Sequence, residues 1–202
     1  MWAQRAWVGT YLPADTPTGR ELHAYSRAAI TEQLEAVHEV IETFGGQVYA
    51  TATTEGERHR LWEARHNVYY AGLAMRPGAR SWTTDVCVPV SQLAAVIRDT
   101  RADLEASGIL APLVGHVGDG NFHLLMLVHP DDEQALARAR EANDRLVARA
   151  LACGGTCTGE HGIGLGKMSS LAREHGDLLP VMRAIKRAMD PGNLMNPGKV
   201  VG

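Results

Sequence analysis

The sequence feature that most constrains the fold is a hairpin signal between two apolar runs, His116-Val117-Gly118-Asp119-Gly120-Asn121-Phe122-His123. An Asp-Gly pair in this setting is typical of a two-residue hairpin loop, because the tight turn needs positive φ at its centre. With Asp119-Gly120 as the loop, His116 is expected directly opposite His123 on one face of the sheet. Two imidazoles placed in this way can share one metal ion. The alternative is a pair of histidines that simply pack in a half-buried hairpin.

A glycine-rich segment, residues 154–166, carries two further candidate groups, Glu160 and His161. Its spacing fits neither a P-loop nor the GxGxxG motif of dinucleotide-binding proteins. The glycines indicate a backbone that approaches another group closely, with an exposed flexible loop as the alternative. Adjacent side chains of an extended segment point in different directions, so one of the two would ligate a metal while the other faces a substrate.

A site of two histidines and one carboxylate leaves coordination positions open for a chelating substrate. The ion would lower the pKa of a substrate hydroxyl, and a neutral histidine nearby could then take the proton. Arg65 borders the apolar stripe of a predicted helix, residues 56–75. Its guanidinium is either a clamp for a carboxylate or a solvent-exposed cation whose stem covers the stripe.

The order of predicted elements indicates an α+β fold. Helices, inferred from apolar residues at helical spacing, are predicted over residues 26–44, 56–75, 91–107, about 131–152, 167–175 and 177–189. Strands are predicted over residues 48–53 and 81–88 and on both sides of Asp119-Gly120. From residue 81 the order approximates a ferredoxin-like, split βαβ arrangement, with an antiparallel sheet and helices mainly on one face. Residues 1–25 are expected to form a loose lead-in or an edge strand, and residues 26–202 one domain.

Composition limits the partners and the location. The chain has 202 residues, of which 45% are hydrophobic, so a folded domain is expected. A net charge of −3 without a Lys/Arg run argues against nucleic acid or anionic membranes as partners. No stretch reaches the length of a membrane span, and the first residues lack the apolar core of a signal peptide. We therefore expect a cytoplasmic protein, or one held at a membrane through a partner.

The cysteines Cys87, Cys153 and Cys157 show no CxxC spacing, which argues against a disulfide framework or a zinc knuckle. We interpret them as small residues in a reducing compartment. A redox pair formed by Cys153 and Cys157 is the alternative.

Several motifs together resemble the C-terminal domain of FAD-linked oxidases. This flavoprotein family includes D-lactate dehydrogenase (cytochrome), the glycolate oxidase flavin subunit and D-2-hydroxyglutarate dehydrogenase. The resemblance is carried by residues 61–67, 82–89, 116–123, 159–164 and 194–199, and runs from about residue 30 to the end. The sequence is most similar to the D-lactate dehydrogenase and glycolate oxidase branches.

The resemblance implies a role for each candidate residue. It implies that His116, His123 and Glu160 bind a divalent metal, for which imidazole and carboxylate ligands suit Zn, Mn or Fe. It implies that His161 contacts the substrate and is the catalytic base, and that Arg65 holds the substrate carboxylate. The implied reaction oxidises a D-2-hydroxy acid, with hydride transfer to FAD and onward transfer of electrons to an acceptor.

The resemblance also bears on substrate and cofactor. Hydroxyglutarate dehydrogenases have Lys and Asn where this sequence has Thr83 and Leu125, which implies a small 2-hydroxy monocarboxylate such as D-lactate, oxidised to pyruvate. Asn196 and Lys199 are implied to lie near the flavin.

Relatives carry an N-terminal FAD-binding domain, which these 202 residues do not contain. We therefore expect a fragment, an excised domain or a subunit that needs an FAD-binding partner and is inactive alone. The alternatives are a non-catalytic metal-binding or assembly subunit and, third, a small metallohydrolase.

Overall fold

The computed structural model describes residues 27–48, 50–52 and 54–202. The chain divides into two compact units, Met1–Trp62 and Glu63–Gly202. The predicted lead-in, residues 1–25, lies outside the described residues, and the predicted domain boundary after it stays a prediction.

The first unit contains α2 (Arg27–Thr43), which confirms the helix predicted over residues 26–44. The strand predicted over residues 48–53 has no counterpart among the described residues of that stretch. A strand needs hydrogen-bonding partners for its backbone, and none is found for these described residues. The short sequence pattern was therefore an insufficient signal there.

The second unit is built around an antiparallel sheet whose central strand is β4 (Asn121–Val128). Along one edge of β4 run β1 (Arg80–Thr83) and then β2 (Val86–Cys87), in one continuous register. Along the other edge runs β3 (Leu113–His116). In place of the predicted single strand, residues 81–88, the structure thus has two short strands separated by residues 84 and 85.

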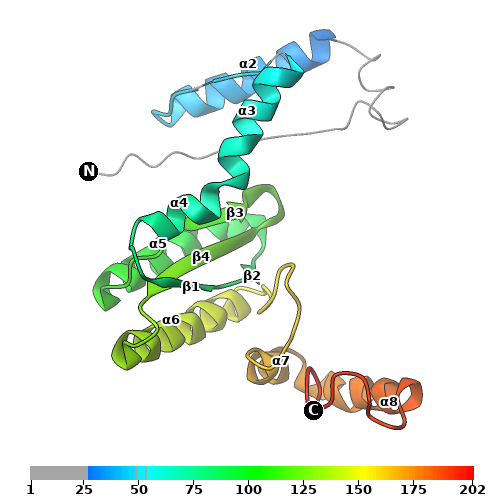
Figure 1. Cartoon of the computed structure of the whole chain (residues 1–202). Coiled ribbons are helices and arrows are strands. Elements are labelled where there is room, and N and C mark those ends of the chain that lie inside the picture. Colours follow the sequence, from blue (N-terminus) through cyan, green and yellow to red (C-terminus); the bar gives the residue numbers. More distant parts are fainter. Residues whose placement is uncertain (1–26, 49, 53) are drawn as a thin grey trace. The chain divides into compact units, whose positions relative to one another are not determined.

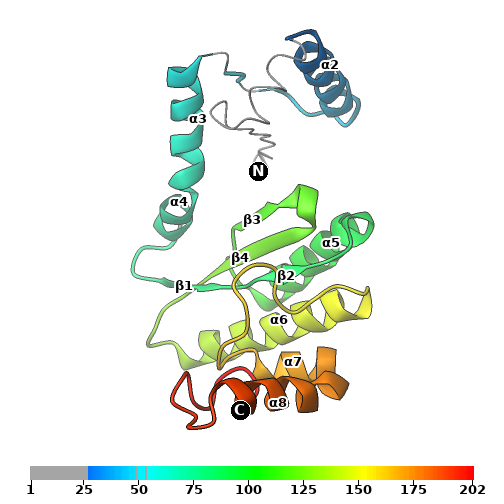
Figure 2. The ribbon, with the colours of Figure 1, turned by 90° about the vertical axis from the view of Figure 1, so that its right-hand side faces the viewer.

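Two long helices, α5 (Val90–Ser107) and α6 (Glu133–Ala152), pack against each other and against the sheet (Figure 2). The order strand, helix, hairpin, helix is that of a split βαβ unit. After α6 the chain returns to the sheet as a single bridge, in which Thr156 pairs with Cys87. The structure therefore confirms the expected α+β fold with an antiparallel sheet and flanking helices.

Successive side chains of β4 alternate between two faces. Phe122, Leu124, Met126 and Val128 belong to the hydrophobic core together with apolar residues of α5 and α6. The intervening residues, among them His123 and Leu125, lie on the opposite face. Every residue of β4 is nevertheless buried, so the opposite face is covered as well.

Part of that cover is α4 (Val68–Ala74), which contacts β4. The helix lies close to the strand, because a Cβ added to Gly72 would be 2.9 Å from Cδ1 of Leu125. α4 follows α3 (Glu55–His66) after Asn67, whose φ of −87° and ψ of 0° leave the helical region. The helix predicted over residues 56–75 is therefore two helices.

The chain ends with α7 (Met168–His175), a 3-10 turn at Gly176–Leu178, α8 (Leu179–Met189) and a short tail (Figure 1). These elements confirm the helices predicted over residues 167–175 and 177–189. Within the described ranges, no helix combines the length and apolar character needed to cross a bilayer.

Candidate metal and substrate site

The hairpin places its two histidines on one face of the sheet, but not directly opposite each other. His116 pairs with Asn121, because the loop is a four-residue one, residues 117–120, that contains a 3-10 turn. The expected direct pairing of His116 with His123 is therefore wrong. The register differs from the prediction by two residues, and since side chains alternate with a period of two, both imidazoles stay on the same face.

Gly120 explains why the loop takes this form. Its φ is +76°, a conformation that side chains with a Cβ rarely adopt, and an added Cβ would lie 1.9 Å from the carbonyl oxygen of Val88. The Gly120 carbonyl also accepts a hydrogen bond from the Val88 N–H at 3.0 Å. The loop is thus pressed against the start of α5, where only glycine fits.

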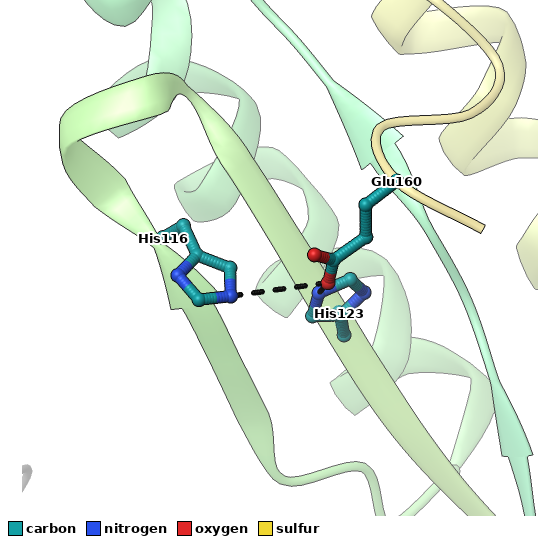
Figure 3. Close-up of side chains that lie close together, drawn as sticks. All are labelled: His116, His123 and Glu160. Carbon is teal, nitrogen blue, oxygen red and sulfur yellow. Dashed lines mark ion pairs between the residues drawn. The ribbon is translucent and has the colours of Figure 1, made fainter.

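Glu160 reaches the two histidines from the glycine-rich segment. Its Oε1 lies 2.8 Å from Nε2 of His123 and 3.8 Å from Nε2 of His116. One ligand atom from each of the three residues lies within 4.8 Å of the other two, so they form a possible metal-binding cluster. Figure 3 shows the Glu160 carboxylate directed towards both imidazoles.

His123 is held in an orientation that suits a ligand. Its Nδ1 lies 3.0 Å from the carbonyl oxygen of Thr84, which fixes Nδ1 as the protonated nitrogen and leaves a lone pair on Nε2. That Nε2 is buried and has no hydrogen-bond partner in the described part of the chain, although Glu160 Oε1 is 2.8 Å away. Two electron-pair donors this close repel each other unless they share a proton or a metal ion. The donor set therefore fits a divalent metal.

A cavity of about 350 Å³ opens beside the cluster, and His116, His123 and Glu160 line it. His161 and Arg65 line the same cavity, so the structure brings together the predicted base, the predicted carboxylate clamp and the cluster. The lining also contains Thr83 and Leu125, the two positions implied to set substrate length, together with Val68, Tyr69, Val114 and Gly115.

Glu160 and His161 both line this cavity, although an extended segment would have pointed them apart. The imidazole Nε2 of His161 lies 3.7 Å from Glu160 Oε1, and the rings of His161 and His123 are 5.4 Å apart. The side chain of His161 is 62% exposed and accessible to a substrate, whereas the side chain of His123 is only 9% exposed. The segment is therefore curled rather than extended at this point.

Asp85 is a member of this region that the sequence analysis did not identify. Burial by itself would raise the pKa of its carboxyl, but hydrogen bonds from the His161 N–H and the Thr158 hydroxyl and the charge of Lys167 outweigh burial and hold the pKa far below its usual range. The available signal was a charged residue, Asp85, in the middle of a predicted strand, because a buried charge needs partners.

Asn196 and Lys199, predicted to lie near the flavin, are not part of the cavity that the histidines line. They line a second cavity of about 390 Å³, formed by α8 and the tail. The tail is folded back onto Asp190, whose pKa is lowered to about 2 by the Lys186 ammonium and by N–H groups of the tail. The described residues thus place these two positions and the histidine cluster in separate cavities.

The described cysteines are all free. Burial raises the pKa of the Cys157 thiol to about 12, with further contributions from Glu174. A thiol with this pKa stays protonated at neutral pH, which argues for the packing interpretation over the redox pair.

A family model described as "FAD linked oxidases, C-terminal domain" matches residues 20–200. The chain is 48% identical over 190 residues to "Probable D-lactate dehydrogenase, mitochondrial" of Danio rerio. The aligned region covers 93% of this chain and 38% of that relative. It is 39% identical over 179 residues to "D-lactate dehydrogenase [cytochrome], mitochondrial" of Arabidopsis thaliana, covering 88% of the chain and 31% of the relative.

A third relative is "Glycolate oxidase subunit GlcD" of Escherichia coli K12, with 30% identity over 171 residues, 84% of this chain and 34% of the relative. The chain thus spans between 31% and 38% of the length of these relatives. The family implies FAD and an FAD-binding domain as partner. The chain belongs to the FAD-linked oxidases, and residues 20–200 correspond to the C-terminal domain of that family.

Proposed function

We propose that this chain is the substrate- and metal-binding part of an FAD-dependent D-2-hydroxy acid dehydrogenase, with D-lactate as its substrate and pyruvate as the product. The observation that carries the proposal is the shared cavity. One wall carries three converging ligand atoms, His161 stands beside them, and the Arg65 guanidinium lines the same space. A 2-hydroxy acid carries a hydroxyl and a carboxylate, and the cavity offers a possible metal site and a base for the first and a guanidinium for the second.

In the proposed reaction, His116, His123 and Glu160 would hold the divalent ion, which would lower the pKa of the substrate hydroxyl. Arg65 donates hydrogen bonds to the substrate carboxylate and fixes its orientation. His161 takes the hydroxyl proton on a ring nitrogen. Oxidation of the alcohol to the ketone also removes a hydride from C2, for which FAD on its own domain would be the acceptor.

The cavity walls favour a short substrate. Thr83 and Leu125 lie on neighbouring strands, opposite each other in the pairing of β1 with β4. Neither side chain can form an ion pair with a second carboxylate, and the buried Leu125 disfavours a charged group beside it. We therefore propose a monocarboxylate with a small apolar substituent, as in lactate, rather than a diacid.

The test is a calorimetric titration of the purified chain with D-lactate, in the presence of Mn²⁺, Zn²⁺ or a chelator. We expect metal-dependent binding of D-lactate and much weaker binding of D-2-hydroxyglutarate. Arg65→Ala should weaken D-lactate binding at least about tenfold, because a charge-assisted hydrogen bond to a carboxylate is lost. The control is Arg60→Ala on the same helix α3, since Arg60 does not line the cavity. Binding that is independent of metal and of Arg65 would contradict the proposal.

A second candidate is a non-catalytic metal-binding or assembly subunit. It is favoured by α8, in which no residue is buried and the apolar side chains of Val181, Ile185 and Met189 are exposed. Exposed apolar residues at helical spacing suit a surface that another domain covers. Flavin reduction by D-lactate, after the chain is combined with a flavin-binding domain of a relative, would separate the two candidates, because an assembly subunit would support none.

The relatives from Danio rerio and Arabidopsis thaliana are named as mitochondrial proteins. These names give no support to the cytoplasmic location expected from composition, and we propose a mitochondrial-type D-lactate dehydrogenase instead. The electron acceptor of such an enzyme is a separate partner, which acceptor-dependent assays of the combined domains would identify.

A further inference from the structure

The interruption between β1 and β2 lies next to the cluster. The register on both sides is the same, with Thr83 opposite Leu125 and Val86 opposite Phe122, so the two intervening residues face Leu124 and His123. Thr84 and Asp85 are only 1% and 3% exposed. Asp85 therefore lies on the His123 face of the sheet, where its Oδ1 is 3.7 Å from Nδ1 of His123.

The Asp85 carboxylate collects donors from the segment that carries Glu160. Its Oδ2 accepts hydrogen bonds from the Thr158 hydroxyl at 2.8 Å and from the His161 N–H at 3.0 Å. The Glu160 N–H lies 3.3 Å from both carboxylate oxygens. Lys167, where the segment ends, donates to the Asp85 carbonyl at 2.9 Å and to Oδ2 at 3.3 Å.

Two consecutive N–H groups directed at one carboxylate fix the orientation of two peptide planes. This explains why Glu160 and His161 line one cavity although they are adjacent in sequence. The approach is close enough to require glycine before them, because a Cβ added to Gly159 would lie 1.9 Å from Asn121 Nδ2 and 2.9 Å from Asp85 Oδ1. The backbone of the segment is thus seated on the Asp85 side chain.

The same two-residue interruption also orients His123. The carbonyl of Thr84 is the hydrogen-bond partner of His123 Nδ1, while the Thr84 hydroxyl accepts the Leu124 N–H at 2.9 Å. Thr84 and Asp85 together therefore hold His123 on β4 and the segment that bears Glu160 and His161.

We propose that Asp85 is the positioning residue of this site: through the backbone N–H groups of Glu160 and His161, it sets where the Glu160 carboxylate and the His161 imidazole stand relative to His123. The inference rests on the proposed function, because the metal and substrate site is itself a proposal, but the hydrogen bonds that hold the segment against Asp85 do not depend on it. Asp85 acts from outside the ligand shell, as groups that orient metal ligands commonly do.

The test compares Asp85→Asn with Asp103→Asn. Asp103 is a matched control because it is also a poorly exposed carboxylate with two cationic partners, Arg145 and Arg149, which join α5 to α6. Co²⁺ is the probe, since its visible absorption reports coordination geometry and its titration gives affinity. We expect Asp85→Asn to weaken Co²⁺ binding by about 10- to 100-fold and to alter the spectrum. Asp103→Asn should leave affinity within about twofold and the spectrum unchanged.

Thr158→Val provides a milder variant if Asp85→Asn does not fold, because it removes one donor to the same carboxylate. We expect it to weaken Co²⁺ binding by about three- to tenfold, in line with one lost hydrogen bond. Unchanged affinity and spectrum in a folded Asp85→Asn, or in Thr158→Val if the former is unfolded, would overturn the proposal.

Amide hydrogen exchange separates this proposal from the proposed function. The amides of Glu160 and His161 should exchange slowly in the unaltered chain and at least about tenfold faster in Asp85→Asn, with no such change in Asp103→Asn. If the unaltered chain bound no Co²⁺, the metal site would be wrong, yet these two amides would still decide whether Asp85 seats the segment. Equal exchange in both variants would overturn the role of Asp85.

Discussion

The two faces of β4 are nearly equally buried but are satisfied in different ways. Towards α5 and α6, Phe122, Leu124 and Met126 are at most 1% exposed and meet other apolar side chains. On the opposite face, Asn121 and His123 are 6% and 7% exposed and carry polar atoms. Two of these atoms, Asn121 Oδ1 and His123 Nε2, have no hydrogen-bond partner among the described residues.

This difference shows how one strand can serve stability and chemistry together. A buried apolar residue gains free energy from packing alone, whereas a buried ring nitrogen without a partner costs free energy until something binds to it. We therefore expect the face towards α5 and α6, called here the helix-covered face, to supply most of the stability of the strand, and the opposite face to bind the proposed metal. Substitutions on the two faces should consequently separate stability from binding.

The largest expected effect is that of Phe122→Ala on the helix-covered face. Phe122 is fully buried, so the substitution should lower the free energy of unfolding by about 3–5 kcal/mol, from the lost apolar contacts and the cavity left behind. Urea denaturation monitored by circular dichroism measures this loss. A loss below about 1 kcal/mol would mean that this face isn't the main source of stability.

His123→Ala on the opposite face should give the reverse pattern. Metal affinity should fall at least about 100-fold, because a residue that binds the metal directly contributes no less affinity than the groups that orient it. The metal-free chain should lose only about 1 kcal/mol, since the carbonyl of Thr84 loses its one side-chain donor. His59→Ala on α3 is the control and should change neither quantity. Unchanged metal affinity in His123→Ala would remove the distinction between the faces.

Gly120→Ala tests the loop, residues 117–120, that sets the register of β3 against β4 and so fixes which side chains lie on each face. The combination of φ +76° and a contact of 1.9 Å with the Val88 carbonyl should cost about 2–3 kcal/mol in the free energy of unfolding. Gly118→Ala in the same loop is the matched control, since an added Cβ there meets nothing within 4 Å. If both variants unfolded at the same denaturant concentration, the loop would not have the conformation described for Gly120.

The smallest effect concerns an ion-pair network on the helix side, where Asp103 accepts hydrogen bonds from Arg145 and Arg149. The Arg145 hydrogen bond is the main cause that lowers the pKa of Asp103, against the opposing effect of burial. A lowered pKa contributes stability that is complete above the unfolded-state value of about 3.9 and is lost as pH falls below it. Asp103→Asn should therefore cost about 1 kcal/mol at pH 7, because the pair is partly screened by solvent, and progressively less below pH about 4. A cost that is constant with pH would assign it to packing instead.

The sequence predicted the sheet hairpin and the helices around it because those signals are local. Apolar periodicity located α5, α6 and α8, and the Asp-Gly pair located the turn. Loop length was wrong by two residues, since it depends on the contact of Gly120 with Val88, which are far apart in the sequence. The face of the histidines was nevertheless right, because an even slip preserves alternation.

Prediction of the site followed the same division. The residues proposed to bind metal and substrate, including Arg65 and His161, were identified from motifs and all line one cavity, whereas Val68, Val114 and Gly115 were not identified. Asp85 was missed because its importance lies in partners 73 to 82 residues further along the chain. Asn196 and Lys199 were predicted by resemblance to lie near the flavin, which stays a prediction; they line a separate cavity with residues of α8.

The close approach of α4 to β4 has a consequence for how the cavity can change over evolution. Cδ1 of Leu125 occupies the space that a side chain at position 72 would need, so the two positions share one volume. Enlargement at position 72 requires a smaller residue at position 125, and a larger residue at 125 is compatible only with glycine at 72. Residues 72 and 125 should therefore vary as a compensating pair, and a smaller residue at position 125 would enlarge the cavity only while position 72 stays glycine.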